Sequence, residues 1–238
     1  MKRNFILDIH THSIVSGHSY GTVREMAQAA KEAGLQLLGI SEHGPGIPGT
    51  VNPFYYTNLE VAPRNLYGVE MVYGCEINVL NGGKLSLSEE FIQFLDYGLV
   101  GIHGLCYENE GIENNTKNVI ECMKHEKVFF VSHPDDDCTP LNYELLVKAA
   151  KEYHVALEVN NSSFRKLDQR LNCLENYRTM LALCNEYKVP IIVNTDAHDP
   201  CFVGDFELAY DFLETVDFDE ELILNTSADK FKKFIGLS

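Results

Sequence analysis

Short apolar runs recur along this chain, and most of them are followed by a histidine or an acidic residue. Seven such runs lie at residues 5–7, 37–41, 70–76, 97–102, 128–132, 155–160 and 189–193. Runs of this length, bounded by polar or turn-forming residues, are typical of strands buried within a parallel sheet. The pattern therefore predicts seven β-strands.

Stretches with helical spacing separate these runs. Met26, Ala27 and Ala30 share one face of a helix that Thr22 can cap and Gly34 can end. Further helices are predicted at residues 89–95, 116–123, 142–153, 173–187 and 206–213. Strands and helices alternate without a linker, a charged block or a low-complexity segment. We therefore predict one parallel α/β domain over residues 1–238.

The composition is that of a globular protein. Of the 238 residues 45% are hydrophobic, and no apolar run approaches the length of a membrane span, about 18 residues. Asp8 and His10 interrupt the first apolar stretch too early for an export signal. We therefore expect a cytoplasmic protein without a membrane partner. The seven cysteines include no Cys-x-x-Cys pair and are expected to be reduced thiols in the core or on the surface.

The formal net charge is −16. This charge argues against broad binding of nucleic acids, because such binding depends on Lys and Arg side chains that displace counterions from phosphates. Much of it is expected to be solvated surface, especially between Asp205 and Glu221. An acidic protein can still bind a phosphate if metal ions make its active site locally positive. The sequence carries no signal for an oligomeric state.

Two pairs of alternating polar residues lie near opposite ends of the chain. His10 and His12 follow the first predicted strand, and Asp196 and His198 follow the last one. Alternate residues of a strand point to the same face, so each pair can direct two donor atoms at one metal ion. The pattern indicates a metal centre at one rim of a sheet or barrel.

Other predicted strands also end in side chains that can bind metals, namely His43, Glu76, His103 and His133. The carboxyl ends of parallel barrel strands form the active-site rim, so these side chains are expected to converge. His18 lies in the first loop, and from its position it could be a surface residue or a ligand. The donors exceed the three or four ligands of one catalytic ion, which implies several ions. Histidine and carboxylate ligands suit zinc, manganese or iron.

This series of residues resembles the PHP family, named for polymerase and histidinol phosphatase, and most closely its stand-alone YcdX-type phosphatases. The resemblance covers essentially the whole chain and rests on nine residues: His10, His12, His18, His43, Glu76, His103, His133, Asp196 and His198. It implies a distorted seven-stranded parallel β/α barrel, similar to a TIM barrel, with three divalent ions at its rim, zinc in the first place.

The resemblance also implies which residues bind each ion. One ion would be bound by His10, His12, Glu76 and Asp196. A second ion would share Glu76 and be bound by His103 and His133, and a third would be bound by His18, His43 and His198. Of these residues, Glu76, Asp196 and His198 are expected to act in catalysis.

The function implied is a phosphoesterase that hydrolyses a small phosphorylated molecule by attack of a metal-bound hydroxide. Arg64, Arg165 and Lys166 are candidate phosphate contacts, because an arginine fork matches the geometry of phosphate. Each of them could equally be an ordinary surface cation. Asn161 is a further candidate contact, since it lies in a segment after the sixth strand that resembles the family. Residues 164–166 depart from the family pattern.

Three other functions stay open at this point. A single-strand exonuclease is disfavoured because the sequence shows no basic, aromatic-rich groove. A metal-dependent amide or lactone hydrolase of a related barrel would share the early His-x-His and the late Asp, but His18 and Glu76 fit it poorly. A metal-binding barrel without catalytic activity is disfavoured because this chain retains the complete set of ligands.

Overall fold

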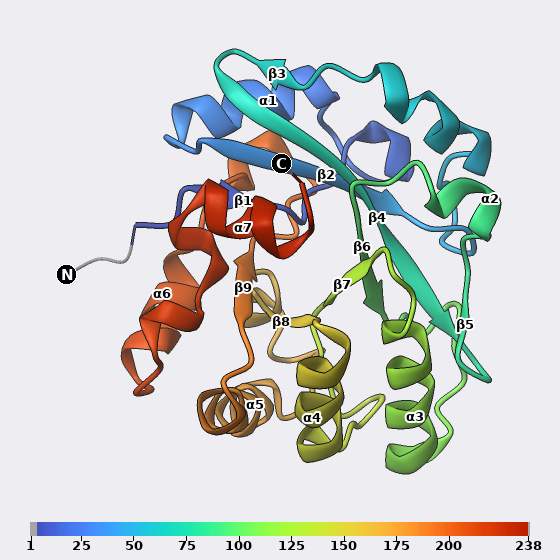
Figure 1. Ribbon diagram of the computed structural model, residues 1–238, viewed down its shortest axis with the longest axis vertical. Helices are drawn as coiled ribbons and strands as arrows, with labels where there is room; N and C mark the ends of the chain where they lie inside the picture. Colours follow the sequence, from blue (N-terminus) through green and yellow to red (C-terminus); the bar gives the residue numbers. More distant parts are fainter. Residues whose placement is uncertain (1–3, 238) are drawn as a thin grey trace.

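The computed structural model describes residues 4–237, in which parallel strands form a nearly closed barrel with helices on its outside (Figure 1). The strands are neighbours in the order of the chain: β1 (Leu7–Asp8), β2 (Leu37–His43), β4 (Val69–Leu80), β6 (Tyr97–Gly101), β7 (Val128–Val131), β8 (Ala156–Asn160) and β9 (Ile191–Asn194). Every pair in this series is parallel. The predicted barrel of seven strands is confirmed.

The barrel closes between its first and last strands. Thr11 forms a parallel bridge with Ala197, and the His12 backbone N–H donates to the Ala197 carbonyl at 2.8 Å. Because the ladder of β1 is only two residues long, a side chain completes the seam: the Ile9 N–H donates to Asn194 Oδ1 at 3.0 Å. This seam brings the two ends of the chain to one rim.

Helices cover the outside of the barrel (Figure 1). They are α1 (Val23–Glu32), α2 (Glu89–Ile92), α3 (Gly111–Met123), α4 (Tyr143–Tyr153), α5 (Cys173–Tyr187), α6 (Glu207–Glu214) and α7 (Ala228–Phe234). The predicted cap of α1 is present as a capping box: Glu25 N–H donates to the Thr22 hydroxyl, and Thr22 N–H donates to the Glu25 carboxylate. Asn142 caps α4 in a similar way.

Two helices differ from their predicted ranges. Helix α3 begins at Gly111 instead of residue 116, because its first turns bury polar side chains that an apolar pattern cannot reveal. Asn115 is buried there and accepts a hydrogen bond from the Tyr107 hydroxyl at 3.0 Å. Helix α2 ends at Ile92 instead of residue 95, because the Leu95 N–H donates to the Ile92 carbonyl in a tighter turn.

Several short elements complete the chain. The strands β3 (Asn65–Leu66) and β5 (Lys84–Leu85) pair antiparallel with β4, and the predicted turn at residues 81–83 connects β4 to β5. The 3₁₀ helices are η1 (Ile14–Ser16), η2 (Pro53–Val61), η3 (Ser163–Arg165), η4 (Pro200–Phe202), η5 (Glu220–Leu222) and η6 (Leu224–Thr226). Strand β4 continues past residue 76, its predicted end, so Glu76 lies within the strand and not after it.

Large apolar side chains fill one end of the barrel interior. Tyr97 and Phe130 are fully buried, and the Tyr97 hydroxyl donates to the Ile9 carbonyl at 2.6 Å. Phe231 of α7, a helix that the sequence pattern did not predict, stacks on Phe130 with ring centroids 6.0 Å apart. Along β8 the interior face passes from Ala156 to the polar Glu158, because alternate residues share a face. The other end of the interior is therefore polar.

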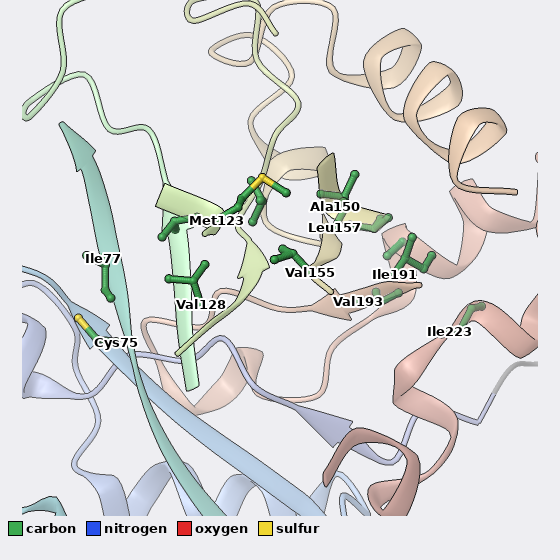
Figure 2. Close-up of a cluster of buried hydrophobic side chains, with 14 of the residues drawn as sticks. Cys75, Ile77, Met123, Val128, Ala150, Val155, Leu157, Ile191, Val193 and Ile223 are labelled. Atoms are coloured by element: carbon green, nitrogen blue, oxygen red, sulfur yellow. The ribbon is translucent and has the colours of Figure 1, made fainter. Parts of the chain in front are cut away.

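A second apolar layer lies between the strands and the outer helices. Figure 2 shows part of it, including Val128 of β7, Leu157 of β8 and Val193 of β9, with Met123 of α3 and Ala150 of α4. Burial of each large aliphatic side chain stabilises the fold by about 1.5–3 kcal/mol. Within residues 4–237, none of the helices has the length and apolar character needed to cross a membrane.

Candidate metal centre

Nine side chains meet at the rim formed by the carboxyl ends of the strands. They are the ones identified from the sequence: His10, His12, His18, His43, Glu76, His103, His133, Asp196 and His198. His43 ends β2 and Glu76 lies within β4, whereas His18 comes from the loop after η1. The remaining six follow β1, β6, β7 and β9. The barrel thus collects donors that are far apart in the sequence.

Glu76 lies at the centre of this rim, and its side chain is buried. Its Oε1 atom accepts a hydrogen bond from His133 Nε2 at 2.7 Å, and His103 Nε2 lies 3.3 Å from the same oxygen. Its Oε2 atom lies 3.4 Å from His10 Nε2 and 2.8 Å from His43 Nδ1. The two oxygens therefore face two different groups of imidazoles, as expected for a carboxylate that bridges two ions.

A buried carboxylate determines the tautomer of His10. His10 Nδ1 lies 2.7 Å from Glu158 Oε1, and Asn194 Nδ2 donates to the same oxygen at 2.8 Å. Burial opposes ionisation of Glu158, but the neighbouring His10 holds its pKa below the ordinary value. An ionised carboxylate only accepts hydrogen bonds, so Nδ1 carries the proton and Nε2 keeps its lone pair.

A hydroxyl orients His12 in a similar way. Ser16 Oγ donates to Glu42 Oε2 at 2.5 Å and therefore accepts from His12 Nδ1 at 3.1 Å. The same hydroxyl accepts from the His43 backbone N–H at 3.0 Å. Burial raises the pKa of Glu42 to about 7, although the donors on Ser13 and Ser16 act in the opposite direction. His12 Nδ1 thus carries its proton, and the lone pair is on Nε2.

These lone pairs test whether the site suits a metal ion. The Nε2 atoms of His10 and His12 are buried and have no hydrogen-bond partner. His10 Nε2 lies 3.4 Å from Glu76 Oε2, and His12 Nε2 lies 3.3 Å from Asp196 Oδ1. Each contact places a lone pair against a carboxylate oxygen, which is unfavourable in a buried site unless a cation lies between the two atoms. The donors therefore fit a divalent ion bound by imidazole and carboxylate.

A further group of imidazoles surrounds His198. Its Nδ1 atom lies 3.0 Å from the Asp196 carbonyl oxygen, which can only accept, so its lone pair is on Nε2. That Nε2 lies 3.1 Å from His18 Nε2 and 3.3 Å from His43 Nε2. Three imidazole nitrogens at these distances suit a shared ion. The groups able to hold an ion overlap: His12, His43 and His198; His10, His12 and Glu76; His43, Glu76 and His103.

The electrostatics of the centre favour cations. Within residues 4–237, no Lys or Arg forms an ion pair with Glu76 or Asp196, whose partners are histidines. Burial would raise the pKa of both carboxyls, but the neighbouring imidazoles hold them well below their ordinary values. Burial together with neighbouring imidazoles lowers the pKa of His12 and His18. Ionised carboxylates and neutral imidazoles are the forms that bind metal.

His10 is the exception among these groups. Burial lowers its pKa, but the carboxylates of Glu158, Glu76 and Asp196 outweigh that effect and hold the pKa well above the ordinary value. The three carboxylates thus attract a positive charge to this imidazole. A metal ion bound at Nε2 would take the place of the extra proton.

Two residues of the rim have unusual backbone conformations. His133 has a φ of 30° and Asp196 a φ of 52°, values that non-glycine residues rarely adopt. Such conformations cost on the order of 1–3 kcal/mol and persist where the surroundings hold them. The His133 N–H donates to Glu158 Oε2 at 2.7 Å, and Asn160 Nδ2 donates to Asp196 Oδ2 at 3.4 Å. Residues of β8 therefore hold both segments.

A cavity of about 680 Å³ lies beside these donors, and three of the predicted substrate contacts line it: Asn161, Arg165 and Lys166. Arg165 forms an ion pair with Asp205 at 2.5 Å, and its guanidinium lies 5.0 Å from the centroid of the Phe202 ring. Asn161 Oδ1 accepts from the backbone N–H of Ala209 at 2.8 Å, so this side chain also tethers α6.

The structure does not bring the fourth predicted contact, Arg64, to the cavity. Its guanidinium pairs with Asp96, which precedes β6, and lies 5.4 Å from the centroid of the Tyr73 ring. Both partners belong to the amino-terminal ends of their strands. The metal-binding side chains gather at the opposite end of the barrel, so Arg64 acts in packing there.

Sequence reasoning missed several residues that shape the site. Arg170 lines the cavity and pairs with the buried Asp135 at 2.8 Å. Glu42 and Glu158 hold the imidazoles described above. Both carboxylates occupy inward-facing positions of strands whose ends had attracted attention, and an acidic residue inside an apolar run was the available signal. Arg170 had none, because it lies in an irregular loop between η3 and α5.

Comparisons with known proteins agree with this geometry. The family model described as PHP domain matches residues 8–236. A probable phosphatase of Clostridium novyi is 37% identical over 232 residues, which cover 97% of this chain and 94% of the relative. A probable phosphatase of Acetivibrio thermocellus is 38% identical over 232 residues, covering 97% of this chain and 95% of the relative.

Solved structures share the fold at lower sequence identity. Histidinol phosphate phosphatase of Lactococcus lactis, solved with zinc, L-histidinol and phosphate, superposes with a TM-score of 0.62 at 18% identity and covers 90% of this chain and 94% of its own. A chain in the structure of archaeal ribonuclease P with mature tRNA has a TM-score of 0.61 at 15% identity and covers 97% of this chain and 90% of its own. At these identities the likeness concerns the fold.

Proposed function

The chain belongs to the PHP domain family and is a metal-dependent phosphoesterase, and from this premise we propose that it removes phosphate from a small phosphorylated molecule at a centre of three divalent ions. The observation that carries the proposal is the set of buried imidazole lone pairs that face carboxylate oxygens. Zinc is the proposed metal, because imidazole and carboxylate are common zinc ligands. Manganese and iron are the alternatives for the same donors.

The proposed ligands form three sets. The first ion is assigned to His10, His12, Glu76 and Asp196, the second to Glu76, His103 and His133, and the third to His18, His43 and His198. The 3.1 Å contact between His198 and His18 and the position of Glu76 between two groups of imidazoles support these sets. His43 also lies near Glu76, so the second and third sets are in contact.

Divalent ions, when bound, polarise phosphoryl oxygens and lower the pKa of water, which supplies the chemistry for ester hydrolysis. The side chains hold those ions and orient the substrate. Glu76 is buried, and we assign to it the role of a bridge. Asp196 and His198 are partly exposed, with side-chain exposures of 9% and 25%. They line the cavity, so they can contact both an ion and the substrate.

Cations on one wall of the cavity are the proposed phosphate contacts: Arg165, Lys166 and Arg170. Arg170 Nη1 donates to Asp135 and to the His133 carbonyl. Within residues 4–237, no hydrogen bond engages its Nε or Nη2, which can therefore donate to phosphate. Asp135 thus holds the guanidinium in place next to a metal ligand.

The rest of the cavity can take the alcohol part of the substrate. Its volume exceeds that of a phosphate group, and Ile102, Leu105 and Phe202 contribute apolar side chains to its lining. The phosphatase of Lactococcus lactis was solved with a small amino alcohol and phosphate. By analogy we assign this chain a phosphomonoester of a small alcohol as its substrate.

The other functions considered from the sequence receive less support. A lactone or amide hydrolase would not require Glu76 between two groups of imidazoles, and the matching family model covers residues 8–236. A barrel without activity would not be expected to keep a cavity with three cations beside the donors. A nuclease would be expected to show basic side chains along a groove, whereas the cations here lie on one cavity wall.

The proposal is tested by metal analysis and a substrate screen. The purified protein is assayed for bound metals and then screened with phosphomonoesters, phosphodiesters and lactones. We expect monoester hydrolysis that disappears after treatment with a chelator and returns with zinc or manganese. Hydrolysis that persists in the metal-free protein would instead indicate a covalent nucleophile of the chain.

A further inference from the structure

Glu158 is a fully buried carboxylate near the end of β8, and it belongs to none of the proposed ligand sets. Its Oε1 atom accepts hydrogen bonds from His10 Nδ1 at 2.7 Å and from Asn194 Nδ2 at 2.8 Å. Its Oε2 atom accepts from the His133 backbone N–H at 2.7 Å and from Asn160 Nδ2 at 3.2 Å. Each oxygen thus has two donors, which leaves Glu158 no free lone pair for a metal ion.

Two of these four donors belong to proposed metal ligands on different strands. The bond to His10 fixes the tautomer that leaves Nε2 free to bind an ion. The bond to His133 holds a backbone with a φ of 30°, and the ring of that residue points at Glu76, with Nε2 2.7 Å from Oε1. One carboxylate therefore touches the first and the second ligand set, whereas the ligand Glu76 touches them from the other side.

We propose that Glu158 is a positioning residue that holds the His10 ring and the His133 backbone so that both imidazoles face Glu76. It acts through these ligands and not on the substrate, because it does not line the cavity. Removing such a partner of a metal-binding histidine typically weakens metal binding ten- to a hundred-fold, by roughly one to two powers of ten. The inference rests on the proposed function, since it requires that His10 and His133 bind ions.

The alternative role is purely structural. The buried amides and the backbone N–H around Glu158 need acceptors, and an unsatisfied buried donor costs about 1–3 kcal/mol. In that case a substitution would lower the stability of the fold, with or without metal, and would leave the affinity for metal unchanged. Metal affinity therefore separates the two roles, whereas loss of stability alone does not.

The test compares Glu158→Gln with Glu70→Gln. Both changes replace a carboxylate by an amide of nearly the same shape, but Glu70 lies at the start of β4, where it pairs with Lys232. Each protein is stripped with a chelator and equilibrated with zinc or manganese over a range of buffered free concentrations. Bound metal is then counted by mass spectrometry, and kcat and KM are measured with a phosphomonoester.

For Glu158→Gln we expect a ten- to hundred-fold weaker affinity at two of the sites and the wild-type affinity at the third. We also expect kcat to fall while KM changes little. Glu70→Gln should behave as the wild type. Wild-type affinity and stoichiometry in Glu158→Gln would overturn the inference and leave the proposed function standing. A wild-type protein that binds neither metal would overturn both.

A second variant covers the case in which Glu158→Gln does not fold. Glu158→Asp keeps the charge, but its shorter side chain cannot hold His10 Nδ1 and the His133 N–H at 2.7 Å together. We expect it to fold and to bind metal at the same two sites with an intermediate loss of affinity. An unchanged affinity in this variant would also overturn the inference.

Discussion

Thr11 and Ala197 lie side by side in a parallel bridge, and the His12 N–H donates to the Ala197 carbonyl at 2.8 Å. This contact sets the register between the first and the last strand of the barrel. Because of it, His12 Nε2 lies 3.3 Å from Asp196 Oδ1. Two motifs from opposite ends of the chain therefore meet only if the barrel closes, which links formation of the centre to formation of the fold.

The first prediction concerns removal of metal. The buried carboxylates of the centre face imidazoles and one another, so bound cations are expected to stabilise the folded state. An ion present at a thousand times its dissociation constant adds about 4 kcal/mol at each site. For a chain of this size that corresponds to a rise of roughly 8–16 °C in Tm for a single ion.

Scanning calorimetry of stripped and reloaded protein measures this difference. Magnesium serves as a control, since it prefers oxygen ligands and should raise Tm less than zinc does. An equal Tm for the stripped and the zinc-loaded protein would contradict the assignment of the buried lone pairs to metal ions.

The second prediction concerns the phosphate contacts. Arg170→Ala should raise KM for a phosphomonoester more than Arg165→Ala does, because Asp135 holds Arg170 in place whereas Arg165 is 40% exposed and pairs with Asp205. A hydrogen bond to a charged group contributes about 1.5–3 kcal/mol, so the increase for Arg170→Ala should be roughly ten- to a hundred-fold. Metal content should stay at the wild-type level in both variants.

Arg64→Ala is the matched control for these variants. This arginine pairs with Asp96 at the other end of the barrel, so its removal should leave KM unchanged. Steady-state kinetics over a series of monoesters checks the order Arg170, Arg165, Arg64. Unchanged KM values for Arg170→Ala across the series would remove this residue from the substrate site.

The third prediction concerns the closed end of the barrel. Phe231 is fully buried and packs on Phe130 and Tyr97, with ring centroids 6.0 and 6.3 Å away. Phe231→Ala should therefore lower the free energy of unfolding by about 3–5 kcal/mol. Urea denaturation measures the change, with Phe54→Ala as the control, since Phe54 is 73% exposed. The stoichiometry of bound metal should not change, because α7 lies away from the rim.

The strands and the ligand positions could be predicted because each depends on a short local pattern. A buried strand appears as an apolar run, and a rim ligand appears where such a run ends, as for His43 and His103. The prediction was incomplete for segments whose structure depends on partners elsewhere in the fold. Helix α7 is held by Phe231 inside the barrel, and α3 begins early because Asn115 bonds to Tyr107.

The substrate side was harder to predict for a similar reason. The sequence pointed to Arg64 because it lies just before a strand, but that position is the amino-terminal end, away from the rim. Arg170 reaches the cavity because Asp135, which follows β7, pairs with it across the rim. Neither the length nor the path of a loop is encoded in a local pattern, so cations on loops cannot be assigned before the fold is known.

The last prediction concerns Glu76→Gln. The amide keeps nearly the same shape, and Ser132 Oγ, now 3.0 Å from Glu76 Oε1, can still donate to the amide oxygen. We therefore expect the variant to fold. It loses the negative charge that lies between two groups of imidazoles, and two divalent ions about 3.5–4 Å apart repel each other strongly without a shared anion. The two sites that share Glu76 should lose metal, together with most of the activity.

The ion assigned to His18, His43 and His198 should be affected less, because none of its other proposed ligands depends on the charge of Glu76 except His43, whose Nδ1 lies 2.8 Å from Oε2. Metal counting by mass spectrometry, with Glu70→Gln on the same strand as the control, distinguishes the outcomes. Full occupancy in Glu76→Gln would show that Glu76 does not bridge two ions. Loss of every ion would show instead that His43 couples the third site to the other two, so that the centre binds its metals as one unit.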